Sequence, residues 1–374
     1  MEKWSHVEIF YSGDEYYRSL IEAIRHAQKS ITVETYIFDI DSFTETVLKE
    51  LAEARVRGCD VKIVVDGFGT YAWIPQLRSF CQKHHIDLKV FQPLPSPLAW
   101  IFRYFWALSK YFKRFNRRTH RKITIVDEKR AYLGSLNFTK HHVGPQSWRD
   151  TGVCVEGPLV ARLSIAFHIT YLRTIHRGLL GLLARFQWNP SVDPATSLLR
   201  LNTTQRMRRR LYLDLLRRLN TAEKRIYITT AYFLPKRKIL RALTRAAKRG
   251  VDVRILIPGK SDVPLVKWAA FNIIHLLQKK GVKLYEYKKS ILHAKTMILD
   301  DTVFVGSFNL NHRSLIHDLE VEVILPGAKS CESMLKQWEI DLSHSQEMTV
   351  EDYTASTFLG RVFYKLAFRL RYML

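Results

Sequence analysis

Helix-like and strand-like patterns of apolar residues alternate along most of the chain. Residues 15–28 and 207–224 carry apolar positions at helical spacing, and each segment leads into a run rich in β-branched and aromatic residues, at 30–38 and 225–235. In both places a second helical pattern and a second apolar run follow. Helices that alternate with strands in this way predict an α/β fold.

The same series of elements occurs twice in the chain. Residues 55–67 match residues 247–259 with an offset of 192, and in each copy a helical pattern stops at a glycine before an apolar strand begins. Further on, residues 120–138 match residues 293–310, with an offset of 173 between His120 and His293, so the first half carries 19 more residues between these two blocks. The chain is therefore an internal duplication with one insertion.

The duplication predicts two similar α-β-α domains related by a pseudo-two-fold axis. We place them at residues 1–195 and 196–374, joined around the turn-like stretch 189–205. A duplication of this kind can serve stability alone, or it can build one active site at the interface from both copies. The residues that repeat decide between these two interpretations.

Composition limits the classes of protein to consider. With 374 residues, 47% of them hydrophobic, the chain can bury a large core, which excludes intrinsic disorder. Four scattered cysteines suit neither a disulfide framework nor a metal site, and we expect a reducing compartment, no signal peptide and no membrane span. The formal net charge of +24 points to a polyanionic partner, either nucleic acid or an anionic membrane surface.

The most specific feature is a polar motif present in both halves. His-x-Lys, four further residues and Asp occur at His120, Lys122 and Asp127, and again at His293, Lys295 and Asp300. Each motif is followed by Gly-Ser-x-Asn, which adds Ser135 and Asn137 in the first half and Ser307 and Asn309 in the second. Since His and Lys are two residues apart on a predicted strand, both face the same side. Two copies at matching places make coincidence a poor explanation.

These residues suit phosphoryl transfer without a metal or cofactor. A neutral imidazole is a nucleophile near pH 7, and a second imidazole can carry the proton of a leaving group. The two lysines, with the serine hydroxyls and asparagine amides, would stabilise negative charge on the phosphoryl oxygens. The sequence contains no carboxylate cage for Mg²⁺ and no Gly-rich nucleotide loop. We therefore predict no metal and no cofactor.

Each histidine needs an acceptor on its other ring nitrogen to fix its tautomer. Asp150 and Glu320 lie at the start of apolar strands in equivalent places of the two halves, and they are our candidates for these orienting carboxylates. Asp127 and Asp300 compete for the role. Because both end a strand, we expect them instead to anchor the turn that follows.

The duplicated motif resembles that of the phospholipase D superfamily. Within it, SITVETYIFDID, THRKITIVD, WRDTGVCVEGP and LHAKTMILDD make the chain most similar to bacterial cardiolipin synthases of the shorter B type. The resemblance implies transfer through a phosphatidyl-histidine intermediate, with His120 as nucleophile and His293 as acid/base, which converts two phosphatidylglycerol molecules into cardiolipin and glycerol. Asn311 departs from the Asp that is common in the family, and this affects the expected acceptor.

Two segments suggest contact with a membrane. Residues 93–118 interleave aromatic and basic residues without an acidic one, and residues 358–374 form a basic amphipathic helical pattern. The first segment also fits a buried core or a surface that stacks on single-stranded nucleic acid, and the second fits a helix docked on the protein itself. We favour the membrane interpretation for both.

The expected function is therefore phosphatidyl transfer at the cytoplasmic face of the bacterial inner membrane by a peripheral protein. Its partners would be an anionic phospholipid, with phosphatidylglycerol as the expected substrate, and the membrane surface, with no nucleic acid. A phospholipase D-type lipid hydrolase, a nuclease of the same superfamily and a non-catalytic basic binding protein are the alternatives. The sequence makes no prediction of the oligomeric state.

Overall fold

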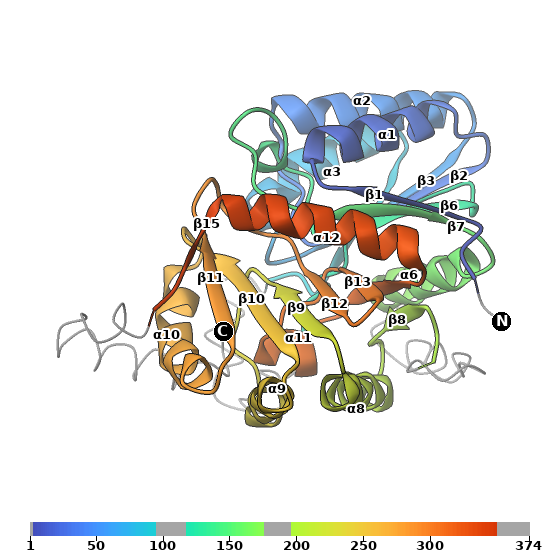
Figure 1. Cartoon of the computed structure of the whole chain (residues 1–374). Coiled ribbons are helices and arrows are strands. Elements are labelled where there is room, and N and C mark those ends of the chain that lie inside the picture. The colour runs from blue at the N-terminus through green and yellow to red at the C-terminus, as the bar shows by residue number, and fades with distance from the viewer. Residues whose placement is uncertain (1–2, 95–116, 176–195, 350–374) are drawn as a thin grey trace, which may run out of the picture.

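Two β-sheets, each covered by helices, form the body of the protein (Figure 1). The computed structural model describes residues 3–94, 117–175 and 196–349. The predicted insertion lies mostly at 95–116 and the predicted amphipathic helix at 358–374, so both lie outside the described residues, as does the first part of the predicted linker, 189–195. Within the described part of the chain, no helix is long and apolar enough to cross a bilayer.

In the described residues of the first half, one seven-stranded sheet and four α-helices are present. Its strands are β1 (His6–Phe10), β2 (Ser30–Thr35), β3 (Asp60–Asp66), β4 (Asp87–Phe91), β5 (Ile123–Val126), β6 (Arg130–Gly134) and β7 (Gly152–Glu156). Its helices are α1 (Gly13–Arg25), α2 (Ser42–Val56), α3 (Ile74–Lys83) and α6 (Val160–Ile175), with 3-10 turns at η1 (Tyr71–Trp73) and η2 (Lys140–His142).

The second half repeats this series with an additional short strand and a short helix. Its strands are β8 (Leu199–Leu201), β9 (Arg225–Thr229), β10 (Asp252–Pro258), β11 (Lys283–Tyr287), β12 (Thr296–Leu299), β13 (Thr302–Gly306), β14 (Val321–Leu325) and β15 (Ser345–Glu347). Its helices are α8 (Gln205–Thr221), α9 (Arg237–Lys248), α10 (Pro264–Gln278), α11 (His312–Ile316) and α12 (Ala328–Ser343).

The two sheets have the same strand order, which confirms the duplication. The first reads β4-β3-β2-β5-β6-β7-β1, and the second reads β11-β10-β9-β12-β13-β14-β8, with β15 added beside β11. In each sheet three neighbouring strands are parallel, β2, β3 and β4 in the first and β9, β10 and β11 in the second. The strand that follows the His-x-Lys motif, β5 or β12, pairs antiparallel with β2 or β9. No strand of the described chain is shared between the sheets.

Both predicted glycine stops are present. Gly58 follows α2 with φ of 97°, and Gly250 follows α9 with φ of 90°. This left-handed conformation ends a helix and is open to glycine without a steric cost. The local pattern therefore ends both helices before the strands β3 and β10.

The layers meet in a core that belongs to both halves. Helices α1, α2 and α3 cover the outer face of the first sheet, and α8, α9 and α10 cover the outer face of the second (Figure 1). A third apolar cluster joins β5, β6 and β7 to β12, β13 and β14, and it includes side chains of α6 and α12. Since burial of apolar surface drives association, this cluster holds the sheets together and fixes the edge at which the two motifs meet.

Candidate active site

The two histidine segments are each bound to the opposite half of the protein. The backbone N–H of His120, just before β5, donates to the carbonyl of Leu319 at 2.9 Å. The N–H of His293, just before β12, donates to the carbonyl of Arg149 at 2.8 Å. Leu319 and Arg149 immediately precede the predicted orienting carboxylates, so the main chain brings each histidine to the carboxylate of the other half.

The side chains also form contacts between the two halves. Nδ1 of His120 lies 3.1 Å from both oxygens of Glu320, and Nδ1 of His293 lies 2.8 Å from Oδ1 of Asp150. All four side chains are buried or nearly so. A carboxylate that accepts from Nδ1–H leaves Nε2 as the reactive nitrogen of the ring. The structure thus places both predicted carboxylates beside an imidazole, with partners exchanged between the halves.

Two buried lysines complete the centre. Lys122 Nζ donates to the carbonyl of His120 at 2.8 Å, and Lys295 Nζ donates to the carbonyl of His293 in the same way. Burial lowers the pKa of Lys122 to about 7, with the charge of Lys295 adding to the effect, and burial lowers the pKa of Lys295 to about 8. The charge of Lys295 lowers the pKa of both Lys122 and His120, so the two motifs lie close enough to interact electrostatically.

Burial and neighbouring charges shift the pKa values of the histidines and carboxylates of the site in different directions. Burial lowers the pKa of both His120 and His293, and the lysine of each motif lowers it further. Burial raises the pKa of Glu320 to about 7, against the opposing charge of Lys122. Burial also acts to raise the pKa of Asp150, but the neighbouring imidazoles outweigh it and hold that pKa well below its usual range.

The serines and asparagines of the two Gly-Ser-x-Asn motifs make different hydrogen bonds. Ser307 donates to Glu320, whereas Ser135 donates to the carbonyl of Thr151 at 3.1 Å and does not contact Asp150. The side-chain oxygen of Asn137 accepts from the N–H of Ile37 at 3.3 Å. The buried side-chain oxygen of Asn309 has no hydrogen-bond partner among the described residues.

Asp127 and Asp300 are not brought to the imidazoles. Each lies just beyond the far end of its strand, with φ of 52° for Asp127 and 53° for Asp300. Each carboxylate accepts backbone N–H groups from three consecutive residues at the start of the neighbouring strand. These are Gln28, Lys29 and Ser30 at β2 for Asp127, and Glu223, Lys224 and Arg225 at β9 for Asp300. The sequence includes these aspartates in the catalytic motif but favours a structural role for them, and four residues of extended strand separate them from the histidines. They anchor the entry to the neighbouring strand, rather than only their own turn.

Sequence reasoning missed His142. Its fully buried ring places Nδ1 2.7 Å from Oδ2 of Asp150, so this carboxylate lies between two imidazoles. The equivalent residue of the second half is Ser314, whose hydroxyl donates to Glu320 at 2.6 Å. Both positions lie seven residues after the motif serine, so a comparison of the copies beyond Gly-Ser-x-Asn was the signal that could have found them.

Among the described residues, the group that offers ligand atoms close enough to share a metal ion is His142, Asp150 and His293, within 4.8 Å of one another. Each Nδ1 of this group already faces a separate oxygen of Asp150. A metal would have to displace both contacts.

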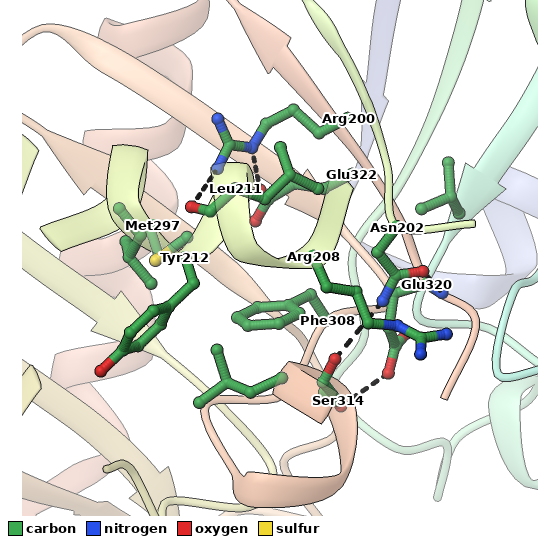
Figure 2. Close-up of a pocket in the computed structure, with 13 residues that line it drawn as sticks. Arg200, Asn202, Arg208, Leu211, Tyr212, Met297, Phe308, Ser314, Glu320 and Glu322 are labelled. Atoms are coloured by element: carbon green, nitrogen blue, oxygen red, sulfur yellow. Dashed lines mark hydrogen bonds and ion pairs between the residues drawn. The ribbon is translucent and has the colours of Figure 1, made fainter. Parts of the chain in front are cut away.

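Glu320 lines a small cavity together with residues of β8, α8 and α11 (Figure 2). Its volume is about 30 Å³, enough for one water molecule. Asn202 accepts the backbone N–H of Glu320 at 2.6 Å, and Arg200 pairs with Glu322 at 2.8 Å on the same strand (Figure 2). The hydrogen bond to Asn202 holds the backbone of Glu320, whose side chain contacts His120.

Comparison with known proteins places the chain in a family. The family model described as "Cardiolipin synthase, PLD-like domain" matches residues 20–167 and 215–342, once in each half. A cardiolipin synthase of Clostridium perfringens is 28% identical over 370 residues, which cover 95% of this chain and 74% of the relative. Cardiolipin synthase B of Salmonella typhi is 30% identical over 329 residues, which cover 85% of this chain and 76% of the relative.

Solved structures share the architecture. Phosphatidylserine synthase of Haemophilus influenzae superposes with a TM-score of 0.71 at 14% identity, covering 98% of this chain and 95% of that one. Polyphosphate kinase of Porphyromonas gingivalis gives a TM-score of 0.57 at 14% identity, covering 90% of this chain and 50% of the kinase. At such identities the likeness concerns the fold alone. Because the family model covers both halves and a relative is 30% identical over most of its length, the chain belongs to the cardiolipin synthase family of phospholipase D-like phosphatidyltransferases.

Proposed function

We propose that this protein is a cardiolipin synthase of the B type that moves a phosphatidyl group from one phosphatidylglycerol to another. The observation that carries the proposal is the pair of exchanged contacts, His120 with Glu320 and His293 with Asp150, around two buried lysines. In the first step Nε2 of His120 attacks the phosphorus and the bond to the glycerol oxygen breaks. His293 gives its Nε2 proton to that oxygen, and glycerol leaves.

The second step reverses these roles. The neutral His293 takes the proton from a hydroxyl of the second phosphatidylglycerol, and that oxygen attacks the phosphorus. The phosphorus–nitrogen bond breaks, His120 is restored, and cardiolipin is the product. Glu320 stabilises the positive charge that the ring of His120 carries in the intermediate, and Asp150 does the same for protonated His293.

The lysines explain how the site holds an anion. The ammonium groups of Lys122 and Lys295 are buried beside the histidines, where electrostatic interactions are stronger than in water. A bound phosphodiester would favour their protonated forms, because an opposite charge at short range raises the pKa of a lysine. Their charges would then oppose the negative charge that develops on the phosphoryl oxygens.

The described surface next to His120 fits a lipid headgroup region. Phe68, in the loop after β3, and Tyr71, the first residue of η1, are 57% and 58% exposed. The buried guanidinium of Arg118, two residues before His120, lies 5.5 Å from the ring of Phe68 and pairs with Asp66, so this loop lies next to the catalytic motif. Exposed aromatic side chains favour the bilayer interface, and the net charge of +24 adds attraction to an anionic bilayer. We therefore place the protein at the cytoplasmic surface of the inner membrane.

The test is incubation of the purified protein with labelled phosphatidylglycerol in mixed vesicles, followed by separation of the lipids. Formation of cardiolipin with release of one glycerol per cardiolipin is the expected result. Phosphatidic acid as the dominant product would identify a hydrolase instead. Cleavage of single-stranded DNA in a parallel reaction, without turnover of the lipid, would contradict the proposal altogether.

A further inference from the structure

The carboxylate that serves His293 is shared with a second imidazole. Oδ1 of Asp150 faces Nδ1 of His293 at 2.8 Å, and Oδ2 faces Nδ1 of His142 at 2.7 Å. All three side chains are buried. Each oxygen of the carboxylate therefore has one ring nitrogen as its partner.

His142 is held rigidly in this position. A Cβ built on Gly13 would lie 1.6 Å from the carbonyl oxygen of His142, so α1 begins in direct contact with its backbone. The ring of Trp148 packs against it at 5.4 Å. Its Nε2 is buried without a hydrogen-bond partner among the described residues, so a proton there would be unsatisfied. The tautomer that fits carries its proton on Nδ1 and donates it to Asp150.

The other half of the site is built differently. Glu320 receives the hydroxyls of Ser307 and Ser314 in addition to Nδ1 of His120. Ser314 occupies the position that His142 occupies in the first half. The duplication thus has two equivalent carboxylates, one shared between two imidazoles and one between an imidazole and two hydroxyls.

We propose that His142 is a positioning residue for proton transfer by His293. By holding the second oxygen of Asp150, it keeps this carboxylate ionised and aimed at Nδ1 of His293, while Nε2 of His293 gives and takes the proton of the reacting alcohol. The inference rests on the proposed function. It gives a physical reason for the two histidines to have different roles in a pseudo-symmetric site.

The charges around the triad agree with this role. The titratable groups that face it are the hydroxyl of Tyr17 on α1 and the ammonium groups of Lys122 and Lys295. Both lysines favour the ionised form of Asp150, and Lys295 disfavours a positive charge on His293. A fixed, ionised Asp150 offsets the second effect, so that His293 can hold a proton when the phosphodiester is bound.

The experiment compares two leaving groups in the first step. Single-turnover release of glycerol from phosphatidylglycerol needs a proton from His293, whereas p-nitrophenolate leaves from the p-nitrophenyl ester of phosphatidic acid without one. We compare His142→Leu with His142→Asn, which has a similar shape but keeps an N–H donor for Asp150. His142→Leu should slow glycerol release about 10- to 100-fold, and p-nitrophenol release by less than about threefold. His142→Asn should recover most of the loss.

The matched control lies in the other half. Ser314→Ala removes a donor from the carboxylate of the nucleophile, so it should slow both leaving groups equally. Equal losses on both substrates in His142→Leu, or no recovery in His142→Asn, would overturn the positioning role. If His142→Leu does not fold by its melting curve, His142→Ser, which copies the second half, replaces it. If the wild-type protein releases glycerol and p-nitrophenol but forms no cardiolipin, only the assignment of phosphatidylglycerol as the acceptor is refuted.

Discussion

Nδ1 of His293 contacts Oδ1 of Asp150 at 2.8 Å, and these two residues come from opposite halves of the duplicated chain. The reciprocal contact joins His120 to Glu320. The exchange follows from the main-chain hydrogen bonds that bind each histidine segment to the other half. Neither half alone contains a motif histidine together with the carboxylate that orients it, so the proposed mechanism depends on the interface.

The roles of the two histidines can be separated by substitution. His120→Ala and His293→Ala should each lower cardiolipin formation by at least about 10³-fold, because one removes the nucleophile and the other the proton donor. With the p-nitrophenyl ester, His293→Ala should still form a covalent phosphatidyl-enzyme, and His120→Ala should not. Mass spectrometry of the quenched protein gives the answer. Turnover like that of the wild type in either variant would end the two-histidine mechanism.

The stability of the substrate-free protein should depend on pH through Glu320. Its pKa is raised by burial from the usual 4.5 to about 7, so its contribution to the free energy of unfolding is complete below pH 4.5 and is lost as pH rises through 7. The difference between the wild type and Glu320→Gln should therefore shift by roughly 1 to 3 kcal/mol across this range. Urea unfolding at a series of pH values measures it. A difference that does not change with pH would contradict the burial of an ionisable group here.

The pH dependence of kcat/KM should report the lysines of the free enzyme. Because burial lowers the pKa of Lys122 to about 7 and that of Lys295 to about 8, both lose their charge as pH rises, and kcat/KM should fall above about pH 7. Lys122→Arg keeps a charge at these pH values and should move this fall upward. Lys122→Met should remove the charge at every pH and lower kcat/KM throughout. A fall at the same pH in Lys122→Arg would assign it to another group.

Chelation should leave the chemistry intact. Two buried lysines supply the positive charge that a divalent ion supplies in other phosphoryl-transfer sites. Dialysis against EDTA should change the initial rate by less than about twofold, within the scatter expected for an unperturbed site. Loss of activity that returns with one added divalent ion would contradict the proposed site.

Vesicle binding should be electrostatic with an aromatic contribution. We expect stronger sedimentation with vesicles rich in phosphatidylglycerol than with phosphatidylcholine vesicles, and a loss of binding as salt rises, because screening weakens the attraction. Phe68→Ser and Tyr71→Ser should weaken binding, whereas Val56→Ser, at an exposed position on the helix α2, should not. Equal binding to neutral and anionic vesicles would refute the electrostatic part.

Much of the architecture was open to prediction from the sequence. Repeated blocks with glycine stops at Gly58 and Gly250 predicted two α/β halves, because local periodicity and helix endings are encoded by neighbouring residues. The two His-x-Lys motifs were found for the same reason, since alternation along a strand places His and Lys on one face.

Tertiary structure decided which residues meet. Asp127 and Asp300 are close to the histidines in sequence, but the extended strands between carry them to the opposite end of the sheet. The contact of His293 with Asp150, and the place of His142 beside it, depend on how the two sheets pack through their common core. The sequence alone determined the repeated elements and the motif residues they carry, because both depend on neighbouring residues. The packing of one half on the other decided which carboxylate each histidine contacts, because contacts between distant residues form only when apolar surfaces are buried together.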